Sequence, residues 1–309
     1  VQLLIDGLIG WINLNGSSLG PALGMHPNIE VRFYNPVDLL APVGLNARYH
    51  EKYFIIDDRW LVMGGRNVSD EFLTGEGDPH YNYDMDVLIH RENATAHEAV
   101  AQLTDYFDGL WASPLCRTQF ADASAADAQR AEDRRASLRA LWPELCAAYP
   151  MTLPDPMTEM VAVEKTILLH NPVDAAPKPP VVFTRLCQLM SMAQERAWLV
   201  TPYLVMDSAM ERTLSAALTA APGDRMLINS RNTGNNTIAS ADYTLHGGAD
   251  RSMAAELWEF QGDWSMHTKA LLMDDDVSVF GSFNFDPRSA YIDTEVMLAV
   301  WSEALNEQL

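Results

Sequence analysis

The sequence predicts an α/β protein made of two similar domains related by a pseudo-twofold axis, with one active site at their interface. The first observation is a repeat in which five residue types keep their spacing: from His to Lys is two positions, to Asp seven, to Gly fourteen and to Asn seventeen. The two copies are His50, Lys52, Asp57, Gly64 and Asn67, and His267, Lys269, Asp274, Gly281 and Asn284. The second observation is that short apolar runs alternate with helical patterns along both halves, which is typical of α/β domains.

Each copy of the repeat predicts a pair of buried strands. Tyr53–Asp57 and Ala270–Met273 are short apolar runs that end at acidic residues. Trp60–Met63 and Val277–Phe280 then predict the second strands, each followed by a glycine-led loop. Successive side chains on a strand point to opposite faces. The two-residue spacing from His to Lys therefore predicts that both side chains lie on one face.

Helical spacing marks further elements and the domain boundaries. A capping pattern at Thr95–Glu98 precedes apolar residues at helical spacing up to Trp111. The stretch 121–141 is rich in alanine and charge and also predicts a helix. We expect a first domain at 1–117, a helical and loop linker at 118–164, and a second domain at 165–309.

Composition limits the classes of function. Lys and Arg number 21 against 42 Asp and Glu, a formal net charge of -21, which argues against a nucleic-acid partner. Three widely spaced cysteines predict neither a disulfide framework nor a zinc site. No apolar run reaches the roughly 18 residues expected of a membrane span.

The internal repeat also predicts that the chain is a fragment. Val1–Asp6 is similar to Arg225–Ser230, but the second copy has further helix and strand material before that strand, from about Lys165. We therefore expect a truncated start, and a truncated end at Leu309 where another helix is due.

The paired motifs resemble those of the phospholipase D superfamily. Within it, the stretches at 64–72 and 281–290 are similar to the bacterial cardiolipin synthase branch. The similarity extends over nearly the whole chain and is weakest between Thr118 and Met160. Its fold would be two phospholipase D-like α/β halves.

The residue types suit phosphoryl transfer without a metal or another cofactor. A neutral imidazole can attack phosphorus, and a second imidazole can protonate the leaving alkoxide. Lys52 and Lys269 can offset charge on the phosphoryl oxygens. Asn67, Ser282 and Asn284 can donate hydrogen bonds to the phosphate. The resemblance implies His50 as nucleophile and His267 as general acid and base, while the internal symmetry leaves the reverse assignment open.

Each catalytic histidine also needs a partner on its other ring nitrogen. Glu295 lies on the strand after the second motif, and the repeat nominates Asp86 as its counterpart after the first. The longer spacing in the first copy predicts an inserted loop around Thr74–Tyr81. We expect Asp57 and Asp274 to fix turns rather than to touch substrate.

The resemblance implies phosphatidyl transfer from a phospholipid through a phosphohistidine to phosphatidylglycerol, giving cardiolipin. Three alternatives stay open: a phospholipase D with water as acceptor, a nuclease of the same superfamily, and a pseudoenzyme that only binds. The negative net charge argues against a nuclease. Because neither motif has lost a position, the sequence also argues against a pseudoenzyme. We expect phospholipids and a membrane surface as partners, at the bacterial cell membrane, through a segment outside this chain.

Overall fold

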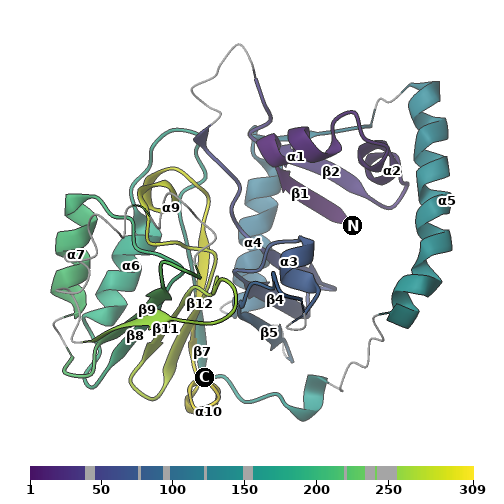
Figure 1. Ribbon diagram of the computed structural model, residues 1–309. Coiled ribbons are helices and arrows are strands. Elements are labelled where there is room, and N and C mark those ends of the chain that lie inside the picture. Colours follow the sequence, from purple (N-terminus) through teal and green to yellow (C-terminus); the bar gives the residue numbers. More distant parts are fainter. Residues whose placement is uncertain are drawn as a thin grey trace. The chain divides into compact units, whose positions relative to one another are not determined.

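The computed structural model describes residues 1–38, 46–75, 78–92, 98–121, 124–148, 156–218, 221–233, 241 and 256–309 (Figure 1). They form two compact units. Unit 1 comprises Val1–Tyr49, Phe107–Met160 and Asp174–Ala176, and unit 2 comprises His50–Tyr106, Val161–Val173 and Pro177–Leu309. Both units mix helices and strands, which confirms the α/β class. The predicted division into a first domain at 1–117, a linker at 118–164 and a second domain at 165–309 stays a prediction.

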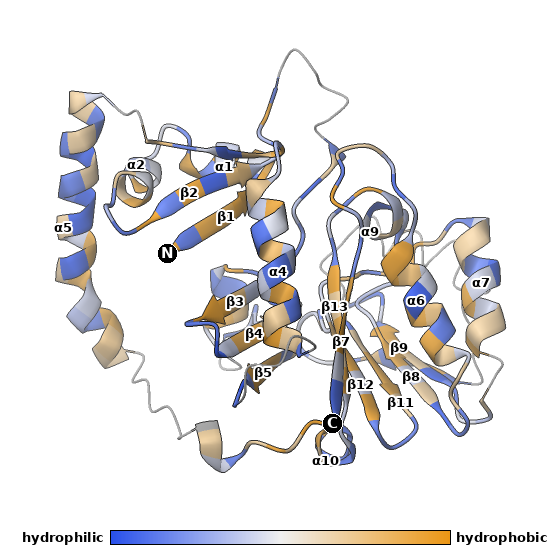
Figure 2. Cartoon of the chain, turned by 180° about the vertical axis from the view of Figure 1, so that it is seen from behind, coloured by the Kyte–Doolittle hydropathy of each residue, from blue (hydrophilic) through white to orange (hydrophobic). Residues whose placement is uncertain are grey.

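Unit 1 is built on a three-stranded sheet in the order β1-β2-β6. Its strands are β1 (Gln2–Asp6), β2 (Glu30–Tyr34) and β6 (Cys116–Thr118), and its helices include α1 (Gly7–Leu14), α2 (Leu19–Gly24) and α5 (Ala125–Ala148). The Asp6 carboxylate accepts the N–H groups of Leu8 and Ile9 and so begins α1. Helix α5 is mostly hydrophilic (Figure 2) and includes residues 125–141 of the helix predicted at 121–141.

Unit 2 contains a seven-stranded sheet in the order β10-β9-β8-β11-β12-β13-β7. The strands are β7 (Lys165–His170), β8 (Ala197–Val200), β9 (Arg225–Asn229), β10 (Glu256–Phe260), β11 (Ala270–Met273), β12 (Val277–Gly281) and β13 (Val296–Trp301). Strands β8, β9 and β10 pair in parallel, and the other pairs are antiparallel. The strands β11 and β12 are buried along their length, as expected for a central hairpin covered on both faces.

Two helices cover one face of this sheet. These are α6 (Val181–Met190) and α7 (Ser208–Leu218), which lie against β8, β9 and β11 in Figure 1. Their apolar residues share a core with the sheet, including Met190 and Leu214. This apolar layer packs against one face of β11 and β12, the strands of the second copy of the motif.

The other face packs against a second, three-stranded sheet. This sheet has the order β3-β4-β5, with β3 (Tyr53–Ile56), β4 (Trp60–Gly64) and β5 (Asp86–His90). Leu61 and Met63 of β4 meet Phe280 of β12 in a buried cluster, which Leu103 of α4 (Ala99–Ala112) also joins. Thr95 of the expected capping pattern lies outside the described residues. The two copies of the motif are thus held together within unit 2.

Short helices follow the motif strands. They are α3 (Asp70–Leu73) after β4 and α9 (Pro287–Tyr291) after β12. Elsewhere, α10 (Glu303–Asn306) follows β13, and a 3-10 turn spans Pro156–Thr158 before β7. One local expectation was wrong: His50, Lys52, His267 and Lys269 precede β3 and β11 instead of lying in those strands. No helix among the described residues has both the length and the apolar character needed to cross a membrane.

Candidate active site

His50 contacts a carboxylate of the other repeat. Its Nδ1 lies 2.9 Å from Oε1 of Glu295, just before β13. The Glu295 side chain is fully buried, whereas 27% of the His50 side chain is exposed. The contact that the sequence suggested for Glu295 is therefore present, with the open part of the imidazole left for a ligand.

The second oxygen of Glu295 is held by Ser282. The Ser282 hydroxyl donates to Oε2 at 2.5 Å and accepts the N–H of Val296 at 3.2 Å. Ser282 is fully buried. The Ser282 hydroxyl thus bonds to Glu295 and to the backbone of Val296, and the expectation that Ser282 binds substrate phosphate stays a prediction.

His267 makes the reciprocal contact with Asp84. Its Nδ1 lies 2.7 Å from Oδ2 of Asp84, whose side chain is fully buried. Asp86, which the sequence nominated for this role, instead accepts from Nε of Arg66 at 2.6 Å. The partner of His267 is thus the other carboxylate of the Asp84–Asp86 pair.

Strand register explains the correction. Gly64 of β4 pairs with Asp86, whereas Gly281 of β12 pairs with Met297. The residues two positions before these partners are Asp84 and Glu295, which are therefore the true counterparts. A two-residue shift leaves a side chain on the same face of a strand, so alternation could not distinguish Asp84 from Asp86.

Each lysine lies beside the histidine of its own motif. Nζ of Lys52 donates to the carbonyl of His50, and Nζ of Lys269 to the carbonyl of His267. Nζ of Lys269 also lies 2.8 Å from Nδ1 of His267. A ring nitrogen has either a hydrogen or a free lone pair, so the contacts to Asp84 and Lys269 exclude each other as hydrogen bonds. We assign the hydrogen to Nδ1, donated to Asp84, which leaves Nε2 with the lone pair.

Burial keeps both imidazoles neutral. It lowers the pKa of His50 to about 3, with further lowering by the charges of Lys52 and Lys269. The pKa of His267 also falls well below its ordinary value, first through burial and then through Lys269. We assign the hydrogen of His50 to Nδ1 as well, where Glu295 can accept it. At neutral pH each Nε2 atom then has the free lone pair that a nucleophile or base needs.

The lysines and carboxylates are shifted by the same desolvation. Burial lowers the pKa of Lys52 to about 8 and of Lys269 to about 7. It raises the pKa of Glu295 to about 8, and it also raises that of Asp84. A buried cluster of this kind is stabilised by an anion near the lysines, because the anion offsets the cost of holding two ammonium groups out of water.

The two asparagines differ in burial. Asn284 is buried, and its Oδ1 has no hydrogen-bond partner within the described parts of the chain. Its backbone N–H lies 3.4 Å from the Ser289 hydroxyl. Asn67 is half-buried. Their role in binding phosphate stays a prediction.

The motif aspartates lie in turns. Asp57 and Asp274 both have positive φ, at 52° and 45°. The Asp274 carboxylate accepts backbone N–H groups from Gln194, Glu195 and Arg196 at 2.9 to 3.1 Å. Asp274 therefore fixes the start of β8, whereas Asp57 is exposed between β3 and β4.

Sequence reasoning missed Arg66, which organises the segment around Asp84. Its guanidinium donates to the carbonyl of Asp84 at 2.7 Å, the carbonyl of Phe72 at 2.8 Å and the hydroxyl of Tyr81 at 3.1 Å. With the bond to Asp86, these contacts hold the loop before β5 on the loop after β4. The glycine pair before Arg66 was the signal, because a Cβ at Gly65 would lie 2.7 Å from Oδ1 of Asp84.

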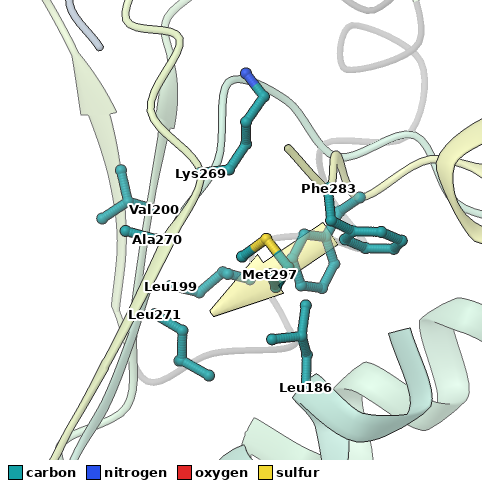
Figure 3. A pocket seen from close by; sticks show the side chains of 9 residues that line it. Leu186, Leu199, Val200, Lys269, Ala270, Leu271, Phe283 and Met297 are labelled. Atoms are coloured by element: carbon teal, nitrogen blue, oxygen red, sulfur yellow. The ribbon is translucent and has the colours of Figure 1, made fainter. Parts of the chain in front are cut away.

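A small apolar gap lies behind the second motif (Figure 3). Leu186, Leu199, Phe283 and Met297 line it, and the Lys269 nitrogen points away from them. Its volume is about 220 Å³ counted over all space between atoms, yet it has no room for a water molecule. This gap is part of the core and is not a ligand site.

Comparison with known proteins places the chain in a family. Residues 1–111 and 186–309 match the model of the cardiolipin synthase, PLD-like domain. The chain is 26% identical to cardiolipin synthase C of Escherichia coli K12 over 92% of its length and 66% of that protein. It is also 26% identical to cardiolipin synthase A of Pseudomonas entomophila, over 86% of the chain and 46% of that protein. The chain thus spans less than two thirds of these relatives.

A solved structure shares the fold. Phosphatidylserine synthase of Haemophilus influenzae Rd KW20 superposes with a TM-score of 0.63 at 16% identity, covering 98% of this chain and 70% of that one. This agreement confirms the phospholipase D-like fold expected from the paired motifs. The family model covers both repeats that carry the His–Lys pairs, and the chain belongs to the family of the cardiolipin synthase, PLD-like domain.

Proposed function

We propose that the protein transfers a phosphatidyl group from a phospholipid to an alcohol through a phosphohistidine on His50. The observation that carries the proposal is the crossed pair of contacts, His50 with Glu295 and His267 with Asp84. Each carboxylate fixes Nδ1–H of its imidazole and so directs a free Nε2 lone pair outward. Two imidazoles of this kind beside two lysines are suited to displacement at phosphorus.

In the first step, Nε2 of His50 attacks phosphorus and the bond to the leaving alcohol oxygen breaks. A bound phosphodiester places negative charge near Lys52 and Lys269, which offsets their depression of the His267 pKa. His267 then enters the step protonated on Nε2 and gives that proton to the leaving oxygen. The products are a phosphoryl–His50 intermediate, a free alcohol and a neutral His267.

In the second step, neutral His267 accepts the proton of the incoming hydroxyl. The resulting oxygen attacks phosphorus, the phosphorus–nitrogen bond breaks, and His50 regains its lone pair. Lys52 and Lys269 offset the charge on the phosphoryl oxygens in both transition states. The positive charge that an imidazole gains at each stage favours the ionised form of its Glu295 or Asp84 partner, and this carboxylate then stabilises the charge.

The relatives support a lipid substrate. Proteins named cardiolipin synthase match most of the chain, so we take phosphatidylglycerol as the acceptor and a second phospholipid as the donor, giving cardiolipin. The substrates lie in a bilayer, and we therefore propose action at the bacterial cell membrane. A phospholipase D that makes phosphatidic acid uses the same intermediate and differs only in the acceptor. The net charge of -21 disfavours a nuclease.

Lipid analysis tests the proposal. The protein is incubated with vesicles of phosphatidylglycerol, and the products are measured by mass spectrometry. Cardiolipin and glycerol in equal amounts are expected, and phosphatidic acid without cardiolipin would instead identify a hydrolase. If neither cardiolipin nor phosphatidic acid forms, phosphatidyl chemistry is refuted for this chain.

Trapping the intermediate tests the roles of the histidines. A radiolabelled phosphatidyl donor should leave an acid-labile, base-stable label on His50 in the wild type. The variant His267→Ala should take up the same label more slowly, because it lacks the general acid of the first step. The variant His50→Ala should take up no label. His90→Ala is the matched control and should label normally, because this imidazole packs on Trp60 at the end of the β4–β5 pair opposite to Gly64 and Asp86. Label on His267 would reverse the assignment.

A further inference from the structure

Aromatic rings gather beside His267. The segment at Tyr83 runs parallel to the segment before the histidine: the Tyr83 N–H donates to the carbonyl of Ser265 at 2.9 Å, and the His267 N–H donates to the carbonyl of Tyr83 at 2.6 Å. Phe72 meets the imidazole of His267 edge to face, with centroids 4.9 Å apart. Tyr83 is thus fixed by backbone bonds against the histidine.

Two further sets of ring contacts lie next to this segment, and the backbone joins them, because His80 precedes Tyr81 and Trp264 precedes Ser265. Tyr83 contacts Tyr81 at 5.4 Å and Phe260 at 5.5 Å, and His80 contacts Trp264 at 4.7 Å between centroids. We call this group of rings the aromatic wall; it comprises Phe72, His80, Tyr81, Tyr83, Phe260 and Trp264. Four residues of the wall are only half-buried: Tyr81, Tyr83, Phe260 and Trp264.

The wall contains a hydrogen-bond donor that has no acceptor. The Nε1 atom of Trp264 is buried and has no hydrogen-bond partner among the residues that the structure describes. A buried indole N–H ordinarily finds an acceptor. An oxygen atom of a ligand that rests on the wall would supply it.

The wall is specific to one of the two histidines. By the register of β5 and β13, the counterpart of Tyr83 is Thr294, whose hydroxyl lies 3.4 Å from the N–H of His50. The loop that carries His80 and Tyr81 lies in the longer spacing of the first repeat. His50 therefore has a small polar residue where His267 has a tyrosine.

We propose that the aromatic wall is the subsite for the accepting alcohol and that it selects a polyol, such as the glycerol group of a lipid, over water. The inference rests on the proposed function, in which His267 serves the oxygen that leaves and the oxygen that enters. That oxygen lies at His267, so the rest of its alcohol lies against the wall. Ring faces pack on the C–H bonds of glycerol, and a second hydroxyl of the polyol accepts from Trp264.

A choline-like alcohol also suits aromatic faces, because a quaternary ammonium is attracted to ring faces. Its only oxygen is the one that reacts, however, so it would leave the Trp264 N–H without an acceptor. Ethanol has the same shortcoming. The number of oxygen atoms in the alcohol is therefore the variable that separates these cases.

A partition experiment measures the selection. Short-chain phosphatidyl donor is supplied with glycerol, choline or ethanol, and the ratio of transfer product to phosphatidic acid is measured. Trp264→Phe should lower the ratio for glycerol about tenfold, the loss expected for one hydrogen bond, and leave those for ethanol and choline unchanged. Trp258→Phe, an exposed tryptophan on β10 outside the wall, is the matched control and should change none of them. An equal fall for all three alcohols, or no fall for glycerol, would overturn the proposal.

A binding measurement keeps the test independent of turnover. The indole ¹H–¹⁵N signal of Trp264, assigned by its loss in Trp264→Phe, is followed in the wild type as glycerol or ethanol is added. Glycerol should move this signal and ethanol should not. A signal that ignores glycerol refutes the wall as a polyol subsite. A signal that responds in a protein without phosphatidyl activity supports the subsite and refutes only the proposed reaction.

Discussion

Asp84 lies 2.7 Å from His267, although the two residues belong to different repeats and are 183 positions apart in the chain. Glu295 makes the reciprocal contact with His50 across 245 positions. A carboxylate in this place holds the imidazole in one tautomer and stabilises its charged form. Neither histidine is therefore oriented by its own repeat.

Asp84→Asn should lower kcat by about 10²- to 10⁴-fold, because an amide neither fixes the tautomer nor stabilises the imidazolium. Asp86→Asn is the matched control, since Asp86 lies two residues away on the same face and pairs with Arg66. We expect it to lower kcat less than about tenfold. Steady-state kinetics on a phosphatidyl donor measure both. A larger loss in Asp86→Asn would restore Asp86 as the partner of His267.

The pH dependence should show an alkaline limb set by the lysines. Because the pKa of Lys269 is lowered to about 7 and that of Lys52 to about 8, both lose their charge as pH rises through this range. The value of kcat/KM should therefore fall above about pH 7, whereas His50, with a pKa of about 3, stays neutral down to acidic pH.

Lys269→Arg tests this assignment, because a guanidinium stays charged throughout. The alkaline limb should move to the value set by Lys52, even if the different shape of arginine lowers the absolute rate. Lys165→Arg, which changes an exposed lysine outside the motifs, should leave the profile as it is. A limb that stays in place in Lys269→Arg contradicts the role of Lys269.

Glu51 should make the protein less stable as pH rises. It is buried, it accepts from the Tyr106 hydroxyl at 2.5 Å, and its Oε2 has no partner within the described residues. Burial raises its pKa from 4.5 to about 7. A raised carboxyl pKa means that the folded state binds the proton more tightly, so the stabilisation is complete below about pH 4.5 and is lost as pH rises through about 7.

Glu51→Gln should remove this dependence. Between pH 5 and 8 its free energy of unfolding should rise relative to wild type by up to about 3 kcal/mol, the value of the shift. Urea unfolding at several pH values measures the difference in free energy of unfolding between the variant and the wild type. The contributions of the histidines cancel in this difference, because both proteins contain them. Glu164→Gln, which changes an exposed carboxylate, is the matched control. A flat difference for Glu51→Gln would show that Glu51 titrates normally.

The two motif aspartates should differ in their effect on stability. Asp274→Gly should cost about 2 kcal/mol, because it removes three bonds to backbone N–H groups while glycine tolerates the positive φ. Asp57→Gly should stay within about 0.5 kcal/mol of wild type. Denaturant titration compares the two variants. Equal losses would mean that the turns, rather than the Asp274 bonds, determine the effect.

The sequence was most informative where a pattern has one interpretation. The apolar runs at Tyr53 and Ala270 predicted β3 and β11 to within one residue, because short apolar segments between acidic turns form buried strands. It was least informative where two residues satisfy the same pattern. Asp84 and Asp86 share a face, and only the pairing of Gly64 with Asp86 tells them apart.

The sequence also could not predict which hydrogen bonds the side chains make. Spacing placed Ser282 near the site but could not show that its hydroxyl donates to Glu295. Nor did it reveal that the described strands of the first repeat form two separate three-stranded sheets while those of the second form one sheet of seven. Hydrogen-bond direction and sheet partition depend on contacts between distant segments, which a local pattern does not contain.

The crossed histidine–carboxylate contacts mean that the two repeats cannot diverge independently. A substitution at Glu295 damages the histidine of the first repeat, and one at Asp84 damages that of the second. A single repeat would regain both contacts only by pairing with a second copy of itself, each copy supplying the carboxylate for the other. Fusing two such copies in one chain makes their encounter independent of concentration. It also lets positions outside the crossed contacts differ between the repeats, as Tyr83 and Thr294 do.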